Sequence, residues 1–404
     1  MWTSARYAAG SILTRRRIAL WAGAIVAVYV ALGIGFHVVT RRQTEAGGNP
    51  AVTDFNTFYA APLLIARDGA AALYDNARLH PVEKEAVDLA HGGRLSGAQL
   101  DTVPVFGWYY PPSFALFLIW LPLLPHMAAY LAWGAVTAIP YLAAMRAAAR
   151  DPLGPLLGLA YPAAMINGLF GQNGFLSAGL LGLGLALLER RPVAAGLCIG
   201  LLSFKPQLGP LIPLALAAGG HWRAFAAAGA TVALMVLASA GLFGADAWQA
   251  FLWGSGRAAT LMETKTPWGL MPTTFAAIRL TGAPPALAYA VHGAVALGAA
   301  GVVLRLWRGA ARFEMKAAAL CLGTLLVTPF AYAYDLVLLA LPTAWLWRDI
   351  LDRGRRPGDA LAIAAGVLLP FATPAIANAF HVQIAPLGLA WMLWRVWRRG
   401  RSSI

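Results

Sequence analysis

Apolar residues occur in long runs along the whole chain, separated by short polar segments. Most runs have about 16–22 residues, the length an α-helix needs to cross a hydrocarbon core of about 30 Å. Such segments must be helices in lipid, because no water is present to satisfy open backbone groups. The pattern therefore predicts an all-α polytopic membrane protein. The runs are 18–39, 108–125, 127–145, 154–170, 174–189, 192–206, 208–220, 223–243, 285–304, 315–330, 332–347, 360–378 and 382–398.

The run 108–125 differs from the others. It opens with WYYPP and also contains Pro122 and Pro125, and prolines disrupt a straight helix. We predict that it forms a re-entrant or juxtamembrane helix, which leaves about twelve spanning helices. The short runs 192–206 and 208–220 meet at a hinge, Lys205-Pro206.

Composition excludes other classes. Of 404 residues, 59% are hydrophobic and 12% charged, with a mean hydropathy of +0.64, more apolar surface than a soluble domain can bury. The net charge of +14 does not indicate nucleic-acid binding, because the basic residues lie in short clusters between apolar runs. Both cysteines, Cys198 and Cys321, lie inside apolar runs, so they predict neither a disulfide framework nor a metal knuckle.

The basic clusters predict the orientation. With twelve spans, cytoplasmic segments hold 21 of the 31 Lys and Arg residues, as the positive-inside rule requires. Both termini are then cytoplasmic, and 40–107 is a large extracytoplasmic first loop within a single domain, 1–404. The run 18–39 is too long for a signal-peptide core, so we expect a retained first helix. The Ala/Arg/Gly bias and the lack of organelle signals indicate a bacterial plasma membrane.

This orientation gathers polar and aromatic side chains at the extracytoplasmic ends of the helices. Polar residues at membrane depth are costly and usually mark function, so we expect a polar cavity there, roofed by the first loop. The candidate site residues are Asp54, Asn56, Tyr59, Trp108, Tyr109, Tyr110, Gln172, Asn173, Lys205, Arg257, Lys265, Trp268, Tyr334 and Asp335.

Each candidate also has a structural interpretation. Thr53-Asp54 before FNTFYAA suits a helix N-cap, and GQN (171–173) suits a simple helix–helix turn. The tryptophans and tyrosines suit an aromatic interface belt, and Lys205 could extend its ammonium toward water. In the first loop, apolar residues near helical spacing within 76–100 predict a short amphipathic helix that ends at Gly92-Gly93.

The order of these motifs resembles glycosyltransferase family 87, within the GT-C superfamily of integral-membrane glycosyltransferases. The matching stretches are DFNTFYAAPLLIARDGAAALYD (54–75), YYPPSFALFLIWLPLLP (109–125), the segment 171–214 from GQNG to LIPL, and TPFAYAYDLVLLALP (328–342). The chain departs from the family at 328–335, where the family has Ser-Pro followed by Trp and His. It also lacks an Asn-Gln-Ser motif in 257–275.

The resemblance implies transfer of a sugar, most often mannose, from a polyprenyl-phosphate donor to a lipid or glycan acceptor hydroxyl. It implies that Asp54 is the general base, with Asp335 as the alternative. We expect Lys205, Arg257 and Lys265 to face the donor phosphate, and the other candidates to hold the sugar or the acceptor. With no His/Asp cluster at metal-ligand spacing, we expect no metal or other cofactor, and no nucleic-acid partner.

Two other hypotheses stay open. A transporter or flippase for a lipid-linked solute would explain the many helices and the break at Lys205-Pro206. Against it, the first loop is long, the polar residues gather on one face, and no internal repeat is evident. A non-catalytic envelope scaffold is the third hypothesis, and it predicts that Asp54 tolerates replacement by Asn.

Overall fold

The computed structural model describes residues 14–264 and 266–401, without the side chains of Arg257 and Ala258. All regular elements in these ranges are helices, which confirms the all-α prediction. The N-terminal half contains α1 Arg15–Glu45, α2 Phe55–Asp68, η2 Ala70–Tyr74, α3 Asn76–Ala90, α4 Gly97–Leu100, α5 Pro112–Ala115, η3 Leu121–Leu123, α6 His126–Ala149, α7 Gly154–Leu159, α8 Pro162–Phe170, α9 Gly174–Leu187, α10 Pro192–Leu201 and η4 Leu202–Phe204.

The C-terminal half continues the same architecture. Its elements are η5 Pro206–Leu208, α11 Leu211–Ala218, α12 Trp222–Phe243, α13 Ala245–Thr264, η6 Trp268–Leu270, α14 Thr274–Leu280, α15 Pro285–Arg308, α16 Phe313–Val327, η7 Ala333–Leu339, α17 Ala340–Arg353, α18 Asp359–Phe380 and α19 Ala385–Arg401. Within the described residues, five helices are long and apolar enough to cross a membrane: α1, α6, α12, α15 and α18. The protein is therefore a helical membrane protein.

Several predicted runs are broken rather than continuous. The sequence predicts one helix over 154–170, but the structure has α7 and α8, because the helix restarts at Pro162. The run 332–347 divides into η7 and α17. The predicted break at Lys205-Pro206 is confirmed, with η4 before it and η5 after it. The run 108–125 forms no straight spanning helix, as its prolines predict. It does not form the single re-entrant or juxtamembrane helix expected there either, since it contains only the short pieces α5 and η3.

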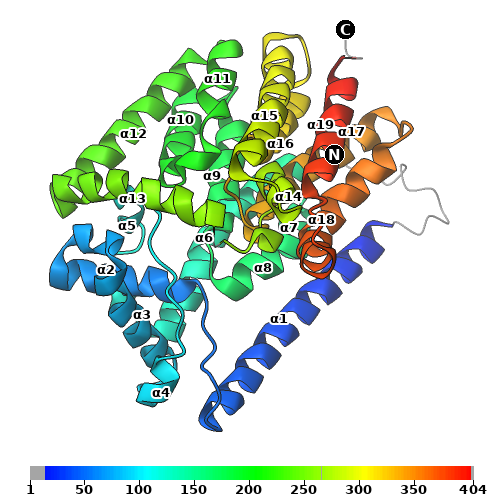
Figure 1. Ribbon diagram of the computed structural model, residues 1–404. Helices are drawn as coiled ribbons and strands as arrows, with labels where there is room; N and C mark the ends of the chain where they lie inside the picture. The colour runs from blue at the N-terminus through cyan, green and yellow to red at the C-terminus, as the bar shows by residue number, and fades with distance from the viewer. Residues whose placement is uncertain (1–13, 265, 402–404) are drawn as a thin grey trace.

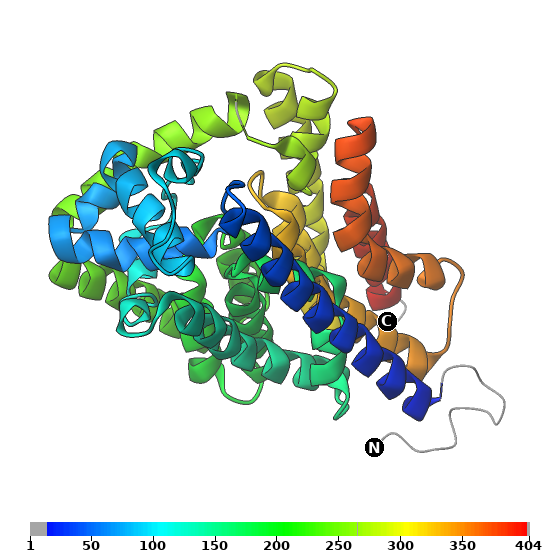
Figure 2. The same cartoon turned by 90° about the horizontal axis from the view of Figure 1, so that it is seen from below.

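The first helix lies at the edge of the molecule. Figures 1 and 2 show α1 running along one side of the other helices. Of its 31 residues, Ala22 and Thr44 are the buried ones. Tyr29 makes one of the contacts of α1 with the bundle: its hydroxyl donates to the Ala160 carbonyl at 3.3 Å, and its ring meets Phe371 edge-on. An apolar helix this exposed is suited to lipid on most of its faces.

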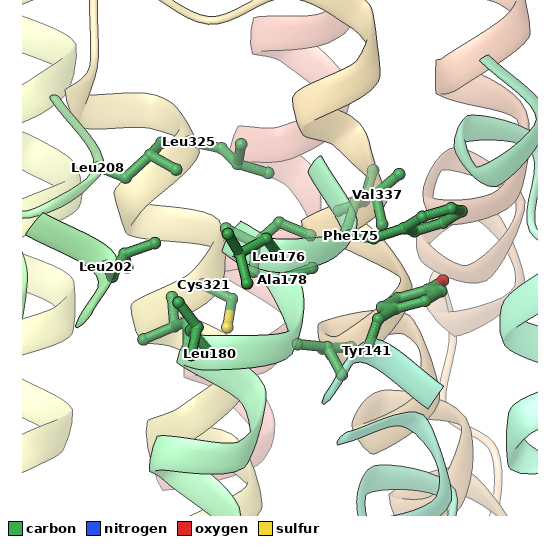
Figure 3. Packing of buried hydrophobic residues seen from close by; sticks show 14 of the residues in the cluster. Tyr141, Phe175, Leu176, Ala178, Leu180, Leu202, Leu208, Cys321, Leu325 and Val337 are labelled. Atoms are coloured by element: carbon green, nitrogen blue, oxygen red, sulfur yellow. The ribbon is translucent and has the colours of Figure 1, made fainter. Parts of the chain in front are cut away.

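The centre of the bundle packs α9 against α6 and η7. Phe175 stacks on Tyr141 with ring centroids 5.1 Å apart, and Figure 3 shows Val337 beside Phe175 and Cys321 below them. Phe175 comes two residues after Asn173, and Val337 two residues after Asp335. The apolar core therefore fixes the backbone from which two candidate site residues project.

The first loop folds into its own small helical layer. The amphipathic helix predicted within 76–100 is confirmed as α3, and Gly92 and Gly93 follow it with φ of +74° and +70°. Its buried face comprises Leu79, Val82, Glu83, Ala86 and Val87. In Figure 1, α2 and α3 lie together on the left, below α13.

A network of ion pairs, with a buried centre, joins segments at the opposite end of the bundle from the first loop. Arg399 is fully buried and donates to both Asp349 and Asp359, which lie on α17 and α18. Segments that the sequence assigns to one side of the membrane therefore contact one another. The other pairs there are Arg395–Asp359, Arg312–Asp349, Arg348–Glu314, Arg150–Glu314 and Arg15–Asp151.

Candidate active site

Asp54 stands at the start of α2 but does not cap it. No backbone amide of α2 donates to its side chain, so the N-cap interpretation of this side chain is wrong. Its Oδ2 accepts a hydrogen bond from Gln172 Nε2 at 2.8 Å. Within the described residues this is the one hydrogen bond to the carboxylate, which leaves it acceptor capacity for a ligand.

The turn that carries Gln172 is fixed by two glycines. Gly171 has φ of +64°, and a Cβ there would lie 2.6 Å from Phe55 Cβ in the first turn of α2. A Cβ on Gly174 would lie 2.7 Å from the Tyr334 carbonyl. The turn is therefore wedged between the start of α2 and the start of η7, where a larger residue would displace the backbone.

Lys205 and Asp335 form a buried ion pair next to this turn. Lys205 is 2% exposed and Asp335 3%, and Lys205 Nζ lies 2.5 Å from Asp335 Oδ1. The same ammonium donates to Asn173 Oδ1 at 3.0 Å. An ammonium has three N–H donors, so one donor remains after these two bonds.

Tyrosines line the space between the two carboxylates. The Tyr334 ring centroid lies 4.7 Å from Lys205 Nζ, within cation–π range, and Tyr332 stacks on Tyr334. The Tyr110 hydroxyl donates to Gln172 Oε1 at 3.5 Å. Asp54, Gln172, Asn173, Lys205 and Asp335 thus belong to one connected polar cluster, which we call the site cluster. Asn173 Nδ2 is buried there without a hydrogen-bond partner in the described residues.

Other candidates lie around this cluster rather than in it. Asn56 is buried and its Oδ1 lies 2.9 Å from His126 Nε2, while the Tyr59 hydroxyl donates to the Leu124 carbonyl at 3.0 Å. Both side chains point to the α6 side. Trp108 is buried and packs against Phe58 and Phe114, as expected of a core aromatic. Tyr109 is 40% exposed.

The remaining candidate residues lie in α13 and in the segment that follows it. Trp268 donates from Nε1 to the Met262 carbonyl at 2.8 Å, and the Arg279 guanidinium stacks over its ring at 4.5 Å. Met262 belongs to a small apolar cluster against which Trp268 and Tyr332 both pack, so this segment adjoins the site cluster. Arg257 lies in α13, but its side chain, like the whole of Lys265, is outside the described part of the chain.

Burial controls the charge of Asp54. Its removal from water raises the pKa of the Asp54 carboxyl above its usual range, and the Gln172 hydrogen bond partly opposes that rise. A carboxylate with a raised pKa is a stronger proton acceptor than a free one. No group of three or more His, Cys, Asp or Glu side chains with metal-binding geometry occurs in the residues that the structure describes.

The fold and the cluster together define a helical membrane protein with a partly buried carboxylate beside a buried, ion-paired lysine. The glycosyltransferase family 87 model matches residues 108–329, more than half of the chain, and the chain belongs to this family. The match includes Tyr110, Gln172, Asn173 and Lys205, whereas Asp54 and Asp335 lie outside it. Neither the curated proteins nor the solved structures contain a significant match.

Three residues of the site escaped sequence reasoning. Asn167 accepts the Gly174 amide at 2.7 Å through Oδ1, Arg279 holds Trp268, and Glu83 lies buried beneath α2. Asn167 was four residues from a motif that the sequence singled out. Glu83 could have been suspected as a lone acid among the apolar positions of α3.

Proposed function

We propose that this protein transfers a sugar, mannose by the family resemblance, from a polyprenyl-phosphate donor to an acceptor hydroxyl. The observation that supports this most directly is the Asp54 carboxylate, held by Gln172 beside the Lys205–Asp335 pair. Membership of a glycosyltransferase family favours transfer over the transporter and scaffold hypotheses.

In the proposed reaction, Asp54 removes the proton of the acceptor hydroxyl. The oxygen attacks the anomeric carbon of the sugar while the bond from that carbon to the phosphate oxygen breaks. Polyprenyl phosphate leaves with the electron pair. A single displacement of this kind inverts the anomeric centre. General-base help typically contributes about 10²–10⁴-fold to such a step.

Asp335 is the less suitable base. Its Oδ1 is occupied by Lys205, and its Oδ2 accepts the Tyr332 amide at 3.0 Å. Both oxygens of Asp335 are thus engaged, whereas Asp54 accepts one hydrogen bond from the described residues and keeps acceptor capacity for a hydroxyl. We therefore assign Asp335 to holding Lys205 and Asn173 in place for the sugar or the acceptor.

Negative charge that develops on the departing phosphate requires nearby donors. Lys205 supplies one through its remaining N–H, and Arg257 and Lys265 are further candidates on the segment that adjoins Trp268. For the sugar or the acceptor we propose Asn56, Tyr59, Trp108, Tyr109, Tyr110, Gln172, Asn173, Trp268, Tyr334 and Asp335. We propose no metal or other cofactor, so chelators should leave transfer unchanged.

The proposal includes a membrane arrangement. The chain would form one GT-C-like domain with about twelve crossings, several made by broken helices. Both termini would be cytoplasmic and the site extracytoplasmic, in a bacterial plasma membrane. The ion-pair network supports the grouping of the basic segments at one end, since it joins segments near Arg15, Asp151, Glu314 and Asp349. The exposed apolar surface of the helices would accommodate the polyprenyl chain.

The test is transfer of radiolabelled mannose from polyprenyl-phosphate mannose into lipids and glycans by purified protein in membranes. Asp54→Asn should lose about 10²–10⁴-fold in rate at matched amounts of folded protein. Asp335→Asn should lose activity together with stability. Equal transfer by wild type and Asp54→Asn would remove Asp54 as the base, and no transfer by either would reject the donor.

A further inference from the structure

A fully buried carboxylate on α3 has no role in the chemistry proposed above. Glu83 is 0% exposed and lies on the same face of the helix as the buried residues Leu79, Val82, Ala86 and Val87. An apolar side chain would pack there without loss of hydration, whereas a buried carboxylate is unfavourable unless donors surround it. The hydrogen-bond donors around Glu83 therefore show which segments of the chain it holds together.

Three donors from three segments converge on Glu83. The Thr57 hydroxyl on α2 donates to Oε1 at 3.0 Å. The Phe106 amide, in the extended segment before the WYYPP motif, donates to Oε2 at 3.3 Å. His80, one turn earlier on α3, places Nδ1 3.4 Å from Oε2. Glu83 thus ties α3 to α2 and to the segment that leads to Tyr110.

Both connections lead to the Asp54 carboxylate. The Thr57 amide donates to the Asp54 carbonyl at 3.2 Å, so the side chain bound to Glu83 belongs to the first turn that Asp54 begins. Four residues after Phe106, Tyr110 donates to Gln172 Oε1, and Gln172 is the side chain that holds Asp54. The contacts of Glu83 with Thr57 and with Phe106 therefore both lead to the residues that form the Asp54–Gln172 hydrogen bond.

We propose that Glu83 is a positioning residue for sugar transfer: it clamps the start of α2 and the 103–110 segment so that Asp54 and Tyr110 both meet Gln172. This inference rests on the proposed function. The clamp is distinct from the other links of α3, Arg67–Glu85, Arg78–Asp68 and Lys84–Asp101, which lie at the surface. Surface pairs of that kind contribute little, whereas Glu83 is buried and accepts hydrogen bonds from two other segments.

The clamp can be opened and restored by substitution. Glu83→Ala removes the acceptor from Thr57 and Phe106. Glu83→Gln can keep all three contacts, because its amide oxygen accepts from Phe106 and His80 while its NH₂ donates to the Thr57 hydroxyl. Glu85→Ala is the matched control, since it removes a carboxylate two residues away whose partner, Arg67, is exposed.

The first readout does not depend on the reaction. In hydrogen–deuterium exchange, the Phe106 amide and the first turn of α2 should exchange faster in Glu83→Ala and at the wild-type rate in Glu83→Gln and Glu85→Ala. Unchanged exchange in Glu83→Ala would overturn the clamp, whatever the protein transfers.

The second readout separates positioning from loss of folded protein. Fewer folded molecules lower the amplitude of the pH–rate profile but leave its acidic limb at the same pH. If α2 moves, Asp54 gains water, its burial-raised pKa falls, and the limb moves to lower pH. Transfer by Glu83→Ala should also fall by about 100-fold, the effect of a displacement near 1 Å, and Glu83→Gln should restore both quantities.

Control variants show which group produces the acidic limb of the pH–rate profile. The other titratable groups facing Asp54 are Tyr110, Tyr332, Tyr334 and Asp335 with its partner Lys205, and none hydrogen-bonds Glu83 in the described structure. His80→Asn should leave the limb in place, because His80 faces Glu83 and not Asp54. An unmoved limb with reduced amplitude in Glu83→Ala would overturn positioning. Absence of transfer by the wild type would instead refute the proposed function, and full transfer by Asp54→Asn would remove Asp54 as the base. In either case the exchange measurement would still test whether Glu83 holds the two segments in place.

Discussion

The two buried ionic clusters of this protein differ in how completely their charges are satisfied. At the end that holds α17, α18 and α19, Arg399 donates to two carboxylates and to the carbonyls of Asp349 and Gly354. In the site cluster, Asp54 accepts one hydrogen bond from the described residues, and Asn173 Nδ2 has no partner there. Buried polar groups in native proteins are normally paired, so a place where several unused donors and acceptors gather is a candidate ligand site.

The difference teaches how to separate structural from functional charge in a membrane protein. Both clusters are costly to bury, and both join helices distant in the sequence. Arg399 donates to carboxylates and carbonyls within the chain and so stabilises the fold, while Nε of its neighbour Arg395 has no partner in the described residues. The site cluster keeps one ammonium N–H, one amide and most of a carboxylate unused. The predictions below test this distinction, from the largest expected effect to the smallest.

The largest effect should come from removing a buried cation. Lys205→Met leaves Asp335 buried without its ion-pair partner and should lower stability by about 3–5 kcal/mol. Arg399→Met should cost less, because Asp349 keeps Arg312 and Asp359 keeps Arg395. Both changes are measured by thermal and chemical unfolding in lipid nanodiscs. The two variants should differ in transfer per folded molecule, which Arg399→Met retains and Lys205→Met loses.

A compensated variant sharpens this test. Lys205→Met/Asp335→Leu removes both charges, and well-packed apolar replacements of a buried pair are often neutral or stabilising. We expect stability to recover while transfer stays absent. Recovery of transfer in the double variant would show that the pair is structural, like the Arg399 cluster, and would end the comparison.

Much of this architecture follows from sequence, for physical reasons. Apolar run length predicts helices because lipid leaves the backbone no alternative, and the break at Lys205-Pro206 follows from the missing proline amide. The gathering of GQN, Lys205 and Asp335 was expected from the orientation of the helices. The exact partners were not, since Lys205 and Asp335 are 130 residues apart and no local pattern selects such a pair.

Other features depended on tertiary structure alone. The division of 154–170 into α7 and α8 is not required by composition, because Pro162 could also have occupied a kinked helix. Asp54 satisfied a local N-cap pattern, yet its carboxylate turns to Gln172, 118 residues away. Glu83 became informative only when Thr57 and Phe106 were seen around it. Long-range choices of hydrogen-bond partner therefore remained beyond the sequence.

The GQN turn should be the next most sensitive position. Gly171→Ala adds a Cβ at positive φ and against Phe55, so it should destabilise the protein by about 1–3 kcal/mol and displace Gln172 from Asp54. Gly168→Ala is the matched control within α8, where a Cβ meets nothing within 4 Å. It should be neutral or stabilise by up to about 1 kcal/mol. Unfolding and transfer are measured on both variants. Equal stability and equal transfer in the two variants would contradict the close packing of Gly171 against α2.

The pH dependence of stability should distinguish Asp54 from the paired acids. Because burial raises the pKa of Asp54, the folded state binds this proton more tightly than the unfolded state. Its contribution to stability is present below the unfolded pKa and is lost as pH rises through the folded pKa. Asp54→Asn should therefore be more stable than wild type at neutral pH, and the advantage should vanish in acid.

Two variants complete the pH test. Gln172→Leu removes the hydrogen bond that lowers the Asp54 pKa, so the acidic limb of kcat/KM should move to higher pH. Asp335→Asn should lower stability at neutral pH, because it leaves Lys205 without its counter-charge. A destabilising Asp54→Asn would place Asp54 among the satisfied structural charges and weaken its assignment as base.

The smallest effect, and the finest test of the comparison, concerns Tyr334. Its ring lies over the Lys205 ammonium, an interaction of about 0.5–2 kcal/mol that Phe preserves and Leu removes. Tyr334→Leu should lower stability by that amount, while Tyr334→Phe should leave stability unchanged. If the hydroxyl binds sugar or acceptor, Tyr334→Phe should raise KM by about fivefold, the equivalent of one hydrogen bond of about 1 kcal/mol. Unchanged KM would confine Tyr334 to supporting the lysine, and the unused donor capacity of the site would then have to meet its ligand through Asn173 and Lys205.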